Sequence, residues 1–253
     1  MNAVVNVHSE SAVRGALAFL ERRQIGAIER VSEDCYERLG TARATLQGQS
    51  LYVDGIETVK LQALLGLDAP LDVVRRHFER DPLLGPLQKE FGPVVVPGCW
   101  SPFELSVRAI LGQQVSVAAA RTIAGRVVER WGEGTRFPGP EALADAPLEE
   151  AGIVRQRASC IRGLAKAVRE GSVRFADESM EQLTALKGIG EWTAQYIAMR
   201  AFRNPDAFPA GDLVLRRVAA NGRAPLTESE LLKKAEAWRP WRAYAVILLW
   251  RSA

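Results

Sequence analysis

The most informative stretch of this 253-residue chain is Leu183 to Arg217, which contains LKGIGEWTA (residues 186–194) and then FPAGD (residues 208–212). Two glycines, Gly188 and Gly190, stand two apart between runs whose apolar residues recur at helical spacing. Without Cβ atoms their backbone can approach a phosphate closely, and the N–H groups that start the next helix point outward with the positive end of its dipole. The pattern predicts a compact, anion-binding hairpin between two helices, unless the glycines merely end one helix and begin another.

The sequence around this stretch divides into two parts with different patterning. From Pro102 onward, apolar residues recur at helical spacing between Gly, Pro and Asp, which predicts a wholly helical region. The earlier part is mixed, with helical segments near 11–23, 70–80 and 83–90, a partly alternating run over 27–39, and strand-like runs at 42–46 and 50–57 that flank a Gln-Gly-Gln turn. The Pro/Gly-rich run 92–100 is the candidate linker. We therefore expect an α+β protein, with a small mixed α/β domain over residues 1–96 and an all-α domain over residues 97–253.

The composition argues against several classes of protein. Three scattered cysteines without C-x-x-C spacing, and only two histidines, predict neither a disulfide framework nor a zinc or iron–sulfur centre. The first 22 residues carry acids and arginines among their apolar positions, so they resemble neither a signal peptide nor a membrane span, and we expect a cytoplasmic protein. Residues 1–99 hold 11 Lys/Arg against 13 Asp/Glu, and the remainder holds 22 against 17. The basic excess in the second part mildly favours a polyanionic partner.

Other segments of the helical part carry equally distinctive sequence, namely FEL (103–105), VRAILGQQVSVA (107–118) and WRAYA (241–245). Together with the hairpin they resemble the AlkA-like branch, the bacterial 3-methyladenine DNA glycosylase II type, of the helix-hairpin-helix DNA glycosylase superfamily. The resemblance covers nearly the whole chain from about residue 97 and, more loosely, the N-terminal part. It implies a monomeric bacterial repair enzyme that meets damaged double-stranded DNA in the nucleoid, spans no membrane and needs no cofactor for its chemistry.

Asp212 is the candidate catalytic residue. Cleavage of a base–sugar bond builds positive charge on the deoxyribose, so the enzyme needs a carboxylate beside the sugar. From spacing alone, a helix N-cap before Leu213 and a catalytic carboxylate are equally favoured for Asp212. The match to the family's catalytic aspartate implies that Asp212 stabilises the oxocarbenium-like sugar and helps to orient the attacking water. Family members that also cut the strand place a lysine where this chain has Trp192, so the resemblance implies a monofunctional hydrolase that leaves an abasic site.

Three aromatic residues, Trp192, Tyr196 and Trp250, match positions of the family's base pocket, and Arg251 stands where a further pocket tyrosine is often found. Alkylation at a purine ring nitrogen makes the base cationic, and an electron-rich aromatic wall attracts such a base through cation–π interaction. Trp192 and Tyr196 are four residues apart and so share one face of a helix. Packing in the core is the alternative for any one of these rings.

DNA contacts are expected at the hairpin and at the loop before it. The resemblance assigns them to Gln113, Gln114, Ser116, Gly188, Ile189, Gly190 and Thr193. It also matches the carbonyls of Thr184, Leu186 and Ile189 to positions where the family holds a monovalent cation that bridges to DNA phosphate. Hairpin amides and basic side chains contact phosphates rather than base edges, so binding should depend strongly on salt and little on sequence.

Two positions depart from the family pattern. Gln114 stands where a leucine often fills the gap left by the flipped base, and a cation at Arg251 would repel a cationic base yet could bind a neutral base or a phosphate. Two alternatives to an alkylpurine glycosylase therefore stay open. One is a catalytically weak protein on the same scaffold that binds distorted or branched DNA, and the other is a glycosylase for a neutral lesion such as uracil or hypoxanthine.

Overall fold

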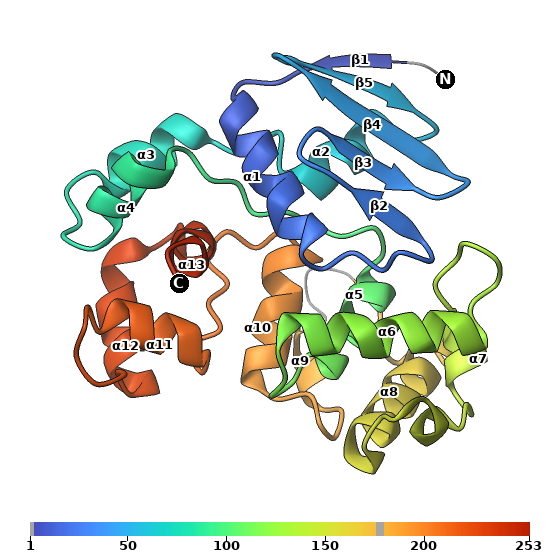
Figure 1. Cartoon of the computed structure of the whole chain (residues 1–253). Helices are drawn as coiled ribbons and strands as arrows, with labels where there is room; N and C mark the ends of the chain where they lie inside the picture. Colours follow the sequence, from blue (N-terminus) through green and yellow to red (C-terminus); the bar gives the residue numbers. More distant parts are fainter. Residues whose placement is uncertain (1–2, 176–179) are drawn as a thin grey trace.

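The computed structural model describes residues 3–175 and 180–253, and it begins with a five-stranded antiparallel sheet (Figure 1). The strands are β1 (Ala3–Asn6), β2 (Glu29–Val31), β3 (Cys35–Arg38), β4 (Ala42–Gln47) and β5 (Ser50–Asp54), in the order β1-β5-β4-β3-β2. Buried and exposed residues alternate along β2 and β4, because successive side chains of a strand point to opposite faces. One face of the sheet therefore belongs to the core, while Val4 and Tyr52 on the other face are exposed.

The predicted hairpin is confirmed as the connection between β4 and β5. Gln47 pairs with Ser50, which leaves a two-residue turn, and its first residue Gly48 has a φ of +57°. Residues other than glycine, asparagine and aspartate adopt this left-handed backbone conformation only at an energetic cost. Gly48 therefore determines where the chain reverses direction.

Helix α1 (Glu10–Glu21) lies between the sheet and the helical part of the molecule (Figure 1). Its N-cap is Ser9, whose hydroxyl accepts a hydrogen bond from the backbone N–H of Ala12. The helix packs against β2 and against α2 (Thr58–Leu65), and it buries an apolar stripe that includes Leu17 and Phe19. α1 is therefore wedged between the two parts of the chain, where its side chains can reach both.

The rest of the described chain is helical, as the sequence predicted from Pro102 onward, apart from an isolated bridge between Glu133 and Arg136. The helices are α3 (Leu71–Phe78), α4 (Leu84–Phe91), α5 (Pro102–Leu111), α6 (Val117–Trp131), α7 (Pro140–Leu143), α8 (Arg155–Arg169), α9 (Met180–Thr184), α10 (Glu191–Arg200), α11 (Leu213–Ala219), α12 (Glu228–Ala235) and α13 (Arg242–Arg251), with short 3-10 helices at Leu148–Ala151 and Glu236–Trp238. The α+β prediction is confirmed. Among the described residues, no helix is long and apolar enough to cross a membrane.

Helices that precede residue 97 also form part of the C-terminal body. α4 packs against α13, and the indole Nε1 of Trp238 donates to Oδ2 of Asp81, just before α4, at 2.8 Å. Trp238 is fully buried and Asp81 is half-buried, so this bond joins the chain before residue 97 to the C-terminal helices.

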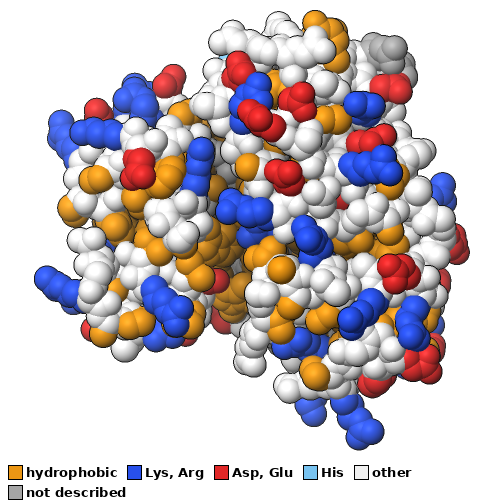
Figure 2. Space-filling view, in the orientation of Figure 1, with side chains coloured by type: hydrophobic (Ala, Val, Ile, Leu, Met, Phe, Trp, Pro, Cys, Tyr) orange, Lys and Arg blue, Asp and Glu red, His pale blue; other side chains and the backbone are white. Residues whose placement is uncertain are grey.

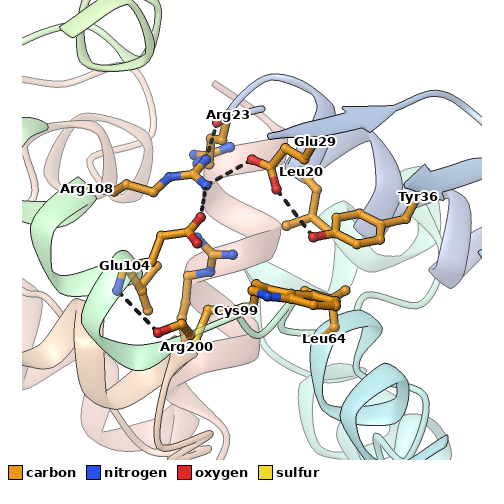
Figure 3. A pocket seen from close by; sticks show the side chains of 12 residues that line it. Leu20, Arg23, Glu29, Tyr36, Leu64, Cys99, Glu104, Arg108 and Arg200 are labelled. Carbon is orange, nitrogen blue, oxygen red and sulfur yellow. Dashed lines mark hydrogen bonds and ion pairs between the residues drawn. The ribbon is translucent and has the colours of Figure 1, made fainter. Parts of the chain in front are cut away.

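A buried cluster of four charged side chains ties the sheet to α5. Figure 3 shows three of them, Glu29, Glu104 and Arg108, and the fourth is Arg38. Arg38 of β3 makes a bidentate pair with Glu104 at 2.6 and 3.2 Å, and Arg108 Nη1 lies 2.9 Å from both Glu29 and Glu104. The hydroxyl of Tyr36 also donates to Glu29. Burial alone would lower the pKa of Arg108, but the two carboxylates outweigh it and raise that pKa. Two cations thus neutralise two anions where neither could be buried alone.

Candidate active site

The predicted hairpin lies between α9 and α10 and is confirmed as a tight turn. Gly188 has a φ of +98°, and a Cβ built on it would lie 3.0 Å from both Cβ and Sγ of the buried Cys160. Gly190 is the N-cap of α10 and has no side chain to satisfy the first N–H groups of that helix. Ile189 between them is buried and anchors the turn, while Lys187 is exposed. The hairpin therefore presents, on a fixed base, backbone N–H groups that have no acceptor among the described residues.

Gln113 holds the loop between α5 and α6 against this hairpin. Its Nε2 donates to the carbonyl of Gly188 and to Oγ1 of Thr193, each at 3.0 Å. The next residue, Gln114, is exposed and has a φ of +55°, and Ser116 caps α6 through the N–H of Ala119. The structure thus brings together the two loops that carry the residues assigned to DNA contact, the α5–α6 loop and the hairpin. Gln113 links them, and Gln114 lies at the exposed tip of the first.

Asp212 lies at the start of α11 and accepts three hydrogen bonds. Its Oδ1 receives the backbone N–H of Leu215 at 3.0 Å and the indole Nε1 of Trp250 at 3.3 Å, and its Oδ2 receives the indole Nε1 of Trp192 at 3.1 Å. The N-cap and the site carboxylate are therefore the same residue. Donors from α10, α11 and α13 converge on it, and its side chain remains partly exposed.

The three predicted pocket aromatics form one wall beside this carboxylate. Trp192 and Tyr196 stack with ring centroids 5.5 Å apart and planes 10° apart, and Tyr196 lies 6.1 Å from Trp250. Phe19 of α1 extends the wall, because it stacks on Trp250 at 6.3 Å. The sequence analysis missed Phe19, since nothing in its local pattern distinguishes it from the other core residues of an amphipathic helix.

Behind the wall lie two guanidinium groups that the sequence analysis also missed. Arg200 donates to the hydroxyl of Tyr196 at 2.8 Å and to the carbonyls of Pro97 and Gly98, and Arg23 lies 3.6 Å from the centroid of the Phe19 ring. Within the described residues, neither forms an ion pair with a carboxylate. Arg200 follows Tyr196 by four residues, so the i, i+4 spacing was a usable signal for it.

This positive charge changes the ionisation of its neighbours. Burial lowers the pKa of Arg23 to about 10. Burial would by itself raise the pKa of Tyr196, but the charges of Arg200 and Arg23 outweigh it and lower that pKa. The back of the aromatic wall is therefore cationic and its phenol is unusually acidic.

Arg251, also assigned to the pocket, makes its contacts elsewhere. Its guanidinium lies 5.5 Å from the ring centroid of Phe91 in α4, and its Nη1 would lie 3.2 Å from a Cβ placed on Gly15 of α1. In the part of the chain that the structure describes, it has no hydrogen bond to Asp212 or to the aromatic wall. Its place in the base pocket stays a prediction.

The carbonyls assigned to a monovalent cation border the hairpin. The carbonyl of Leu186 accepts the N–H of Ile189 at 3.0 Å, and Thr184 ends α9 with its hydroxyl donating to the carbonyl of Met180 at 3.1 Å. A carbonyl oxygen has two lone pairs, so that of Leu186 can still accept one ligand. The described residues hold no group of three or more His, Cys, Asp and Glu side chains that could bind a metal ion.

The carboxylate and its wall lie where two halves of the helical part face each other. α10 comes from one half and α11 and α13 from the other (Figure 1). The space-filling view in the same orientation has a hollow between these halves, lined by hydrophobic side chains and flanked by Lys and Arg (Figure 2). A carboxylate, stacked aromatic rings and an exposed helix-hairpin-helix beside one basic-flanked hollow are the parts of a base-excision repair protein.

Comparison with known proteins gives the same class. The family model of the HhH-GPD superfamily base excision DNA repair protein matches residues 107–243. The DNA-3-methyladenine glycosylase 2 of Escherichia coli (strain K12) is 31% identical over 262 residues, which cover 92% of this chain and 91% of that protein. The chain belongs to the HhH-GPD superfamily of base excision DNA repair proteins, and the resemblance found in the sequence is confirmed.

Solved structures share the fold. The 3-methyladenine DNA glycosylase from Archaeoglobus fulgidus matches with a TM-score of 0.82 and 24% identity, covering 98% of this chain and 96% of that one. The Schizosaccharomyces pombe 3-methyladenine DNA glycosylase, solved in complex with abasic DNA, matches with a TM-score of 0.64 and 25% identity over 71% of this chain and 96% of that one. The first match includes the N-terminal sheet, so the α/β part belongs to the shared architecture.

Proposed function

We propose that the protein hydrolyses the N-glycosidic bond of alkylated purines of the 3-methyladenine type in duplex DNA and leaves an abasic site. The observation that carries this proposal is the carboxylate of Asp212, fixed by two indole N–H groups at the edge of a stacked aromatic wall. The wall would hold an extruded base by stacking, and the carboxylate would face the sugar as positive charge develops on it.

The same geometry supports hydrolysis without strand cleavage. A lyase step needs an amine that can form a Schiff base with the sugar. The residue nearest to the carboxylate in the helix after the hairpin is Trp192, whose only polar group already donates to Asp212. Lys187 is exposed at the hairpin and belongs to its DNA-facing surface in this proposal.

Double-stranded DNA is the proposed partner. The free N–H groups at the start of α10 would bind one phosphate, and Gln114, at the tip of the neighbouring loop, would fill the space left by the flipped base. The carbonyls of Thr184, Leu186 and Ile189 would share a monovalent cation with that phosphate. We place such a protein, as a monomer, in the bacterial cytoplasm with the chromosome.

The test is base release from methylated duplex DNA by the native chain and by Asp212→Asn. Released bases are identified chromatographically, and alkali cleavage of the product counts abasic sites. Release of 3-methyladenine that collapses in Asp212→Asn supports the proposal. Tight binding to DNA without release by the native chain contradicts it, and favours instead a protein that recognises distorted or branched DNA.

The two guanidinium groups behind the wall favour a second candidate, a glycosylase for neutral lesions. Arg23 and Arg200 carry charge that no described carboxylate balances, and positive charge near the pocket opposes a cationic base. A panel of duplexes that contain 3-methyladenine, hypoxanthine or uracil separates the candidates, because this second one predicts faster release of hypoxanthine or uracil than of 3-methyladenine.

A further inference from the structure

The hydrogen bonds of Asp212 use the two tryptophans in a way that an aromatic wall does not require. A stacking surface needs only a ring face, which phenylalanine would also provide. Here both indoles turn their one polar group to the same carboxylate, with Nε1 to oxygen distances of 3.1 Å for Trp192 and 3.3 Å for Trp250. With the N–H of Leu215, three of about four acceptor directions of the carboxylate are occupied, and the free one lies on Oδ2.

We propose that Trp192 and Trp250 are positioning residues, whose indole N–H groups hold the Asp212 carboxylate in one orientation for the sugar. This inference rests on the proposed function, because it assigns how the carboxylate is aimed. Trp192 fixes Oδ2, the oxygen that keeps a free acceptor direction, so it has the larger effect. The carboxylate then acts as a fixed negative charge, already turned toward the place where positive charge develops.

The rings that stack on the two indoles keep them in place. Trp192 is held by the face of Tyr196, whose hydroxyl is in turn fixed by Arg200, and Trp250 is held by Phe19. An indole that could rotate would lose its bond to the carboxylate, since N–H···O bonds weaken steeply with angle. The stacked wall therefore also orients the carboxylate, and α1 takes part in this through Phe19.

The first experiment tests the hydrogen bonds without any need for activity. The chain has six tryptophans, so its indole Nε1–H groups give six signals in a proton–nitrogen NMR spectrum. In Asp212→Asn, the amide keeps one oxygen, which remains the cap for Leu215 and lies beside Trp250, while its NH₂ replaces the acceptor of Trp192. We expect the Trp192 signal to move most and the Trp250 signal to move less. The Trp238 signal, from the indole bonded to Asp81, stays in place.

The second experiment is a double-mutant cycle on single-turnover base release. Trp192→Phe keeps a ring face but removes the N–H, and we expect it to slow release by about 10- to 100-fold, the range of a hydrogen bond to a charged group. Its affinity for abasic product DNA should change by less than about twofold, because that DNA carries no base for the ring to stack on and no developing charge for the carboxylate to stabilise. When Asp212→Asn is already present, the same change should slow release little further, because the indole acts through the carboxylate.

Trp241→Phe is the matched control. This indole lies in the same C-terminal part, packs edge-on against Tyr244 at 5.7 Å, and has no Nε1 hydrogen bond among the described residues. It should release base at the native rate. If Trp192→Phe slows release equally with and without Asp212→Asn, or if the Trp192 signal stays in place in Asp212→Asn, the positioning role is wrong. If the native chain releases no alkylated base at all, the proposed function fails, while the NMR signals still decide whether the indoles hold the carboxylate.

Discussion

Two groups of charged side chains lie close together in this protein, and they are organised in opposite ways. In the cluster between the sheet and α5, Arg38 and Arg108 are matched by Glu29 and Glu104, so the charges balance. At the aromatic wall the carboxylate of Asp212 is held by neutral N–H donors. The guanidinium groups of Arg200 and Arg23 contact rings of the same wall but do not pair with this carboxylate within the described residues.

The difference indicates which charges serve the fold and which are kept for a ligand. A buried ion pair that is satisfied within the protein has little left to offer a substrate. A carboxylate fixed by N–H donors keeps its full negative charge for the positive charge that develops on a sugar. Likewise Arg23 and Arg200 keep a positive field at the back of the pocket. Substitutions at Asp212, Glu104 and the hairpin glycines test this division.

Asp212→Asn should have the largest effect on activity and a small one on stability. We expect base release to fall by about 10²- to 10³-fold or more, because a preorganised charge is lost at the reacting centre. Asparagine caps helices as well as aspartate does, so the free energy of unfolding should change by less than about 1 kcal/mol. Single-turnover release and urea unfolding measure the two quantities. A large loss of stability with a modest loss of rate would make Asp212 a structural residue.

Glu104→Gln should behave in the opposite way. It leaves Arg38 and Arg108 short of one buried carboxylate, and we expect a loss of about 3–5 kcal/mol in unfolding free energy, with base release per folded molecule nearly unchanged. Glu150→Gln is the control, because its pair with Arg130 is exposed, and it should cost less than about 1 kcal/mol. If Glu104→Gln is as stable as the native chain but releases base slowly, this cluster takes part in the reaction and does not differ in role from Asp212.

The two hairpin glycines also separate a role in the fold from a role in binding, although they are only two residues apart. Gly188→Ala should cost about 1–2 kcal/mol of stability, because its φ of +98° disfavours a side chain and the new Cβ would press on Cys160. Gly190→Ala has an ordinary φ and no neighbour within 4 Å of the new Cβ, so the fold should tolerate it. Its affinity for duplex DNA should still fall, because the methyl group stands where a phosphate approaches. Equal affinity for DNA in Gly190→Ala and the native chain would contradict this role of the hairpin.

The sequence predicted those features whose cause is local. Glycine at the β4–β5 turn and at the hairpin, and apolar periodicity after Pro102, each act over a few residues, and the structure confirms them. β1 and α2 were not predicted. β1 is a short edge strand whose four residues gain their order from pairing with β5, and α2 has a weak apolar pattern with an N-cap that makes no side-chain bond.

The candidate site was predictable only in part, for the same reason. Asp212, Trp192 and Tyr196 lie within one short stretch, whose motif matched a family, and Trp250, far along the chain, was assigned to the pocket through the family resemblance alone. Phe19 and Arg23 come from α1, and only the packing of α1 against the C-terminal helices brings them to the wall. Tertiary packing also decides which group each indole N–H meets, so no pattern in the chain could have predicted the hydrogen bonds to Asp212.

The smallest expected effect concerns the ionisation of Tyr196. Ionisation of tyrosine can be followed by its ultraviolet absorbance. Burial raises the pKa of Tyr36, and it raises the pKa of Tyr244 to about 12. The guanidinium charges outweigh burial at Tyr196 and lower its pKa. Tyr196→Phe should therefore remove an early step of the alkaline titration, and Arg200→Met should move that step to higher pH, because it removes the cation bonded to the phenol.

The sign of the linked stability follows from the protons bound in each state. Between the lowered pKa of Tyr196 and its unfolded value near 10, the unfolded chain binds more protons than the native one, so this group adds stability as the pH rises through that window. The contribution is fully present above the unfolded pKa and is lost as the pH falls through the native one. Urea unfolding of the native chain and of Tyr196→Phe at several alkaline pH values isolates it as the difference in slope. Equal slopes would mean that Arg23 and Arg200 leave the pKa of this phenol unchanged. The preference among damaged bases would then be the remaining measurement of their positive charge.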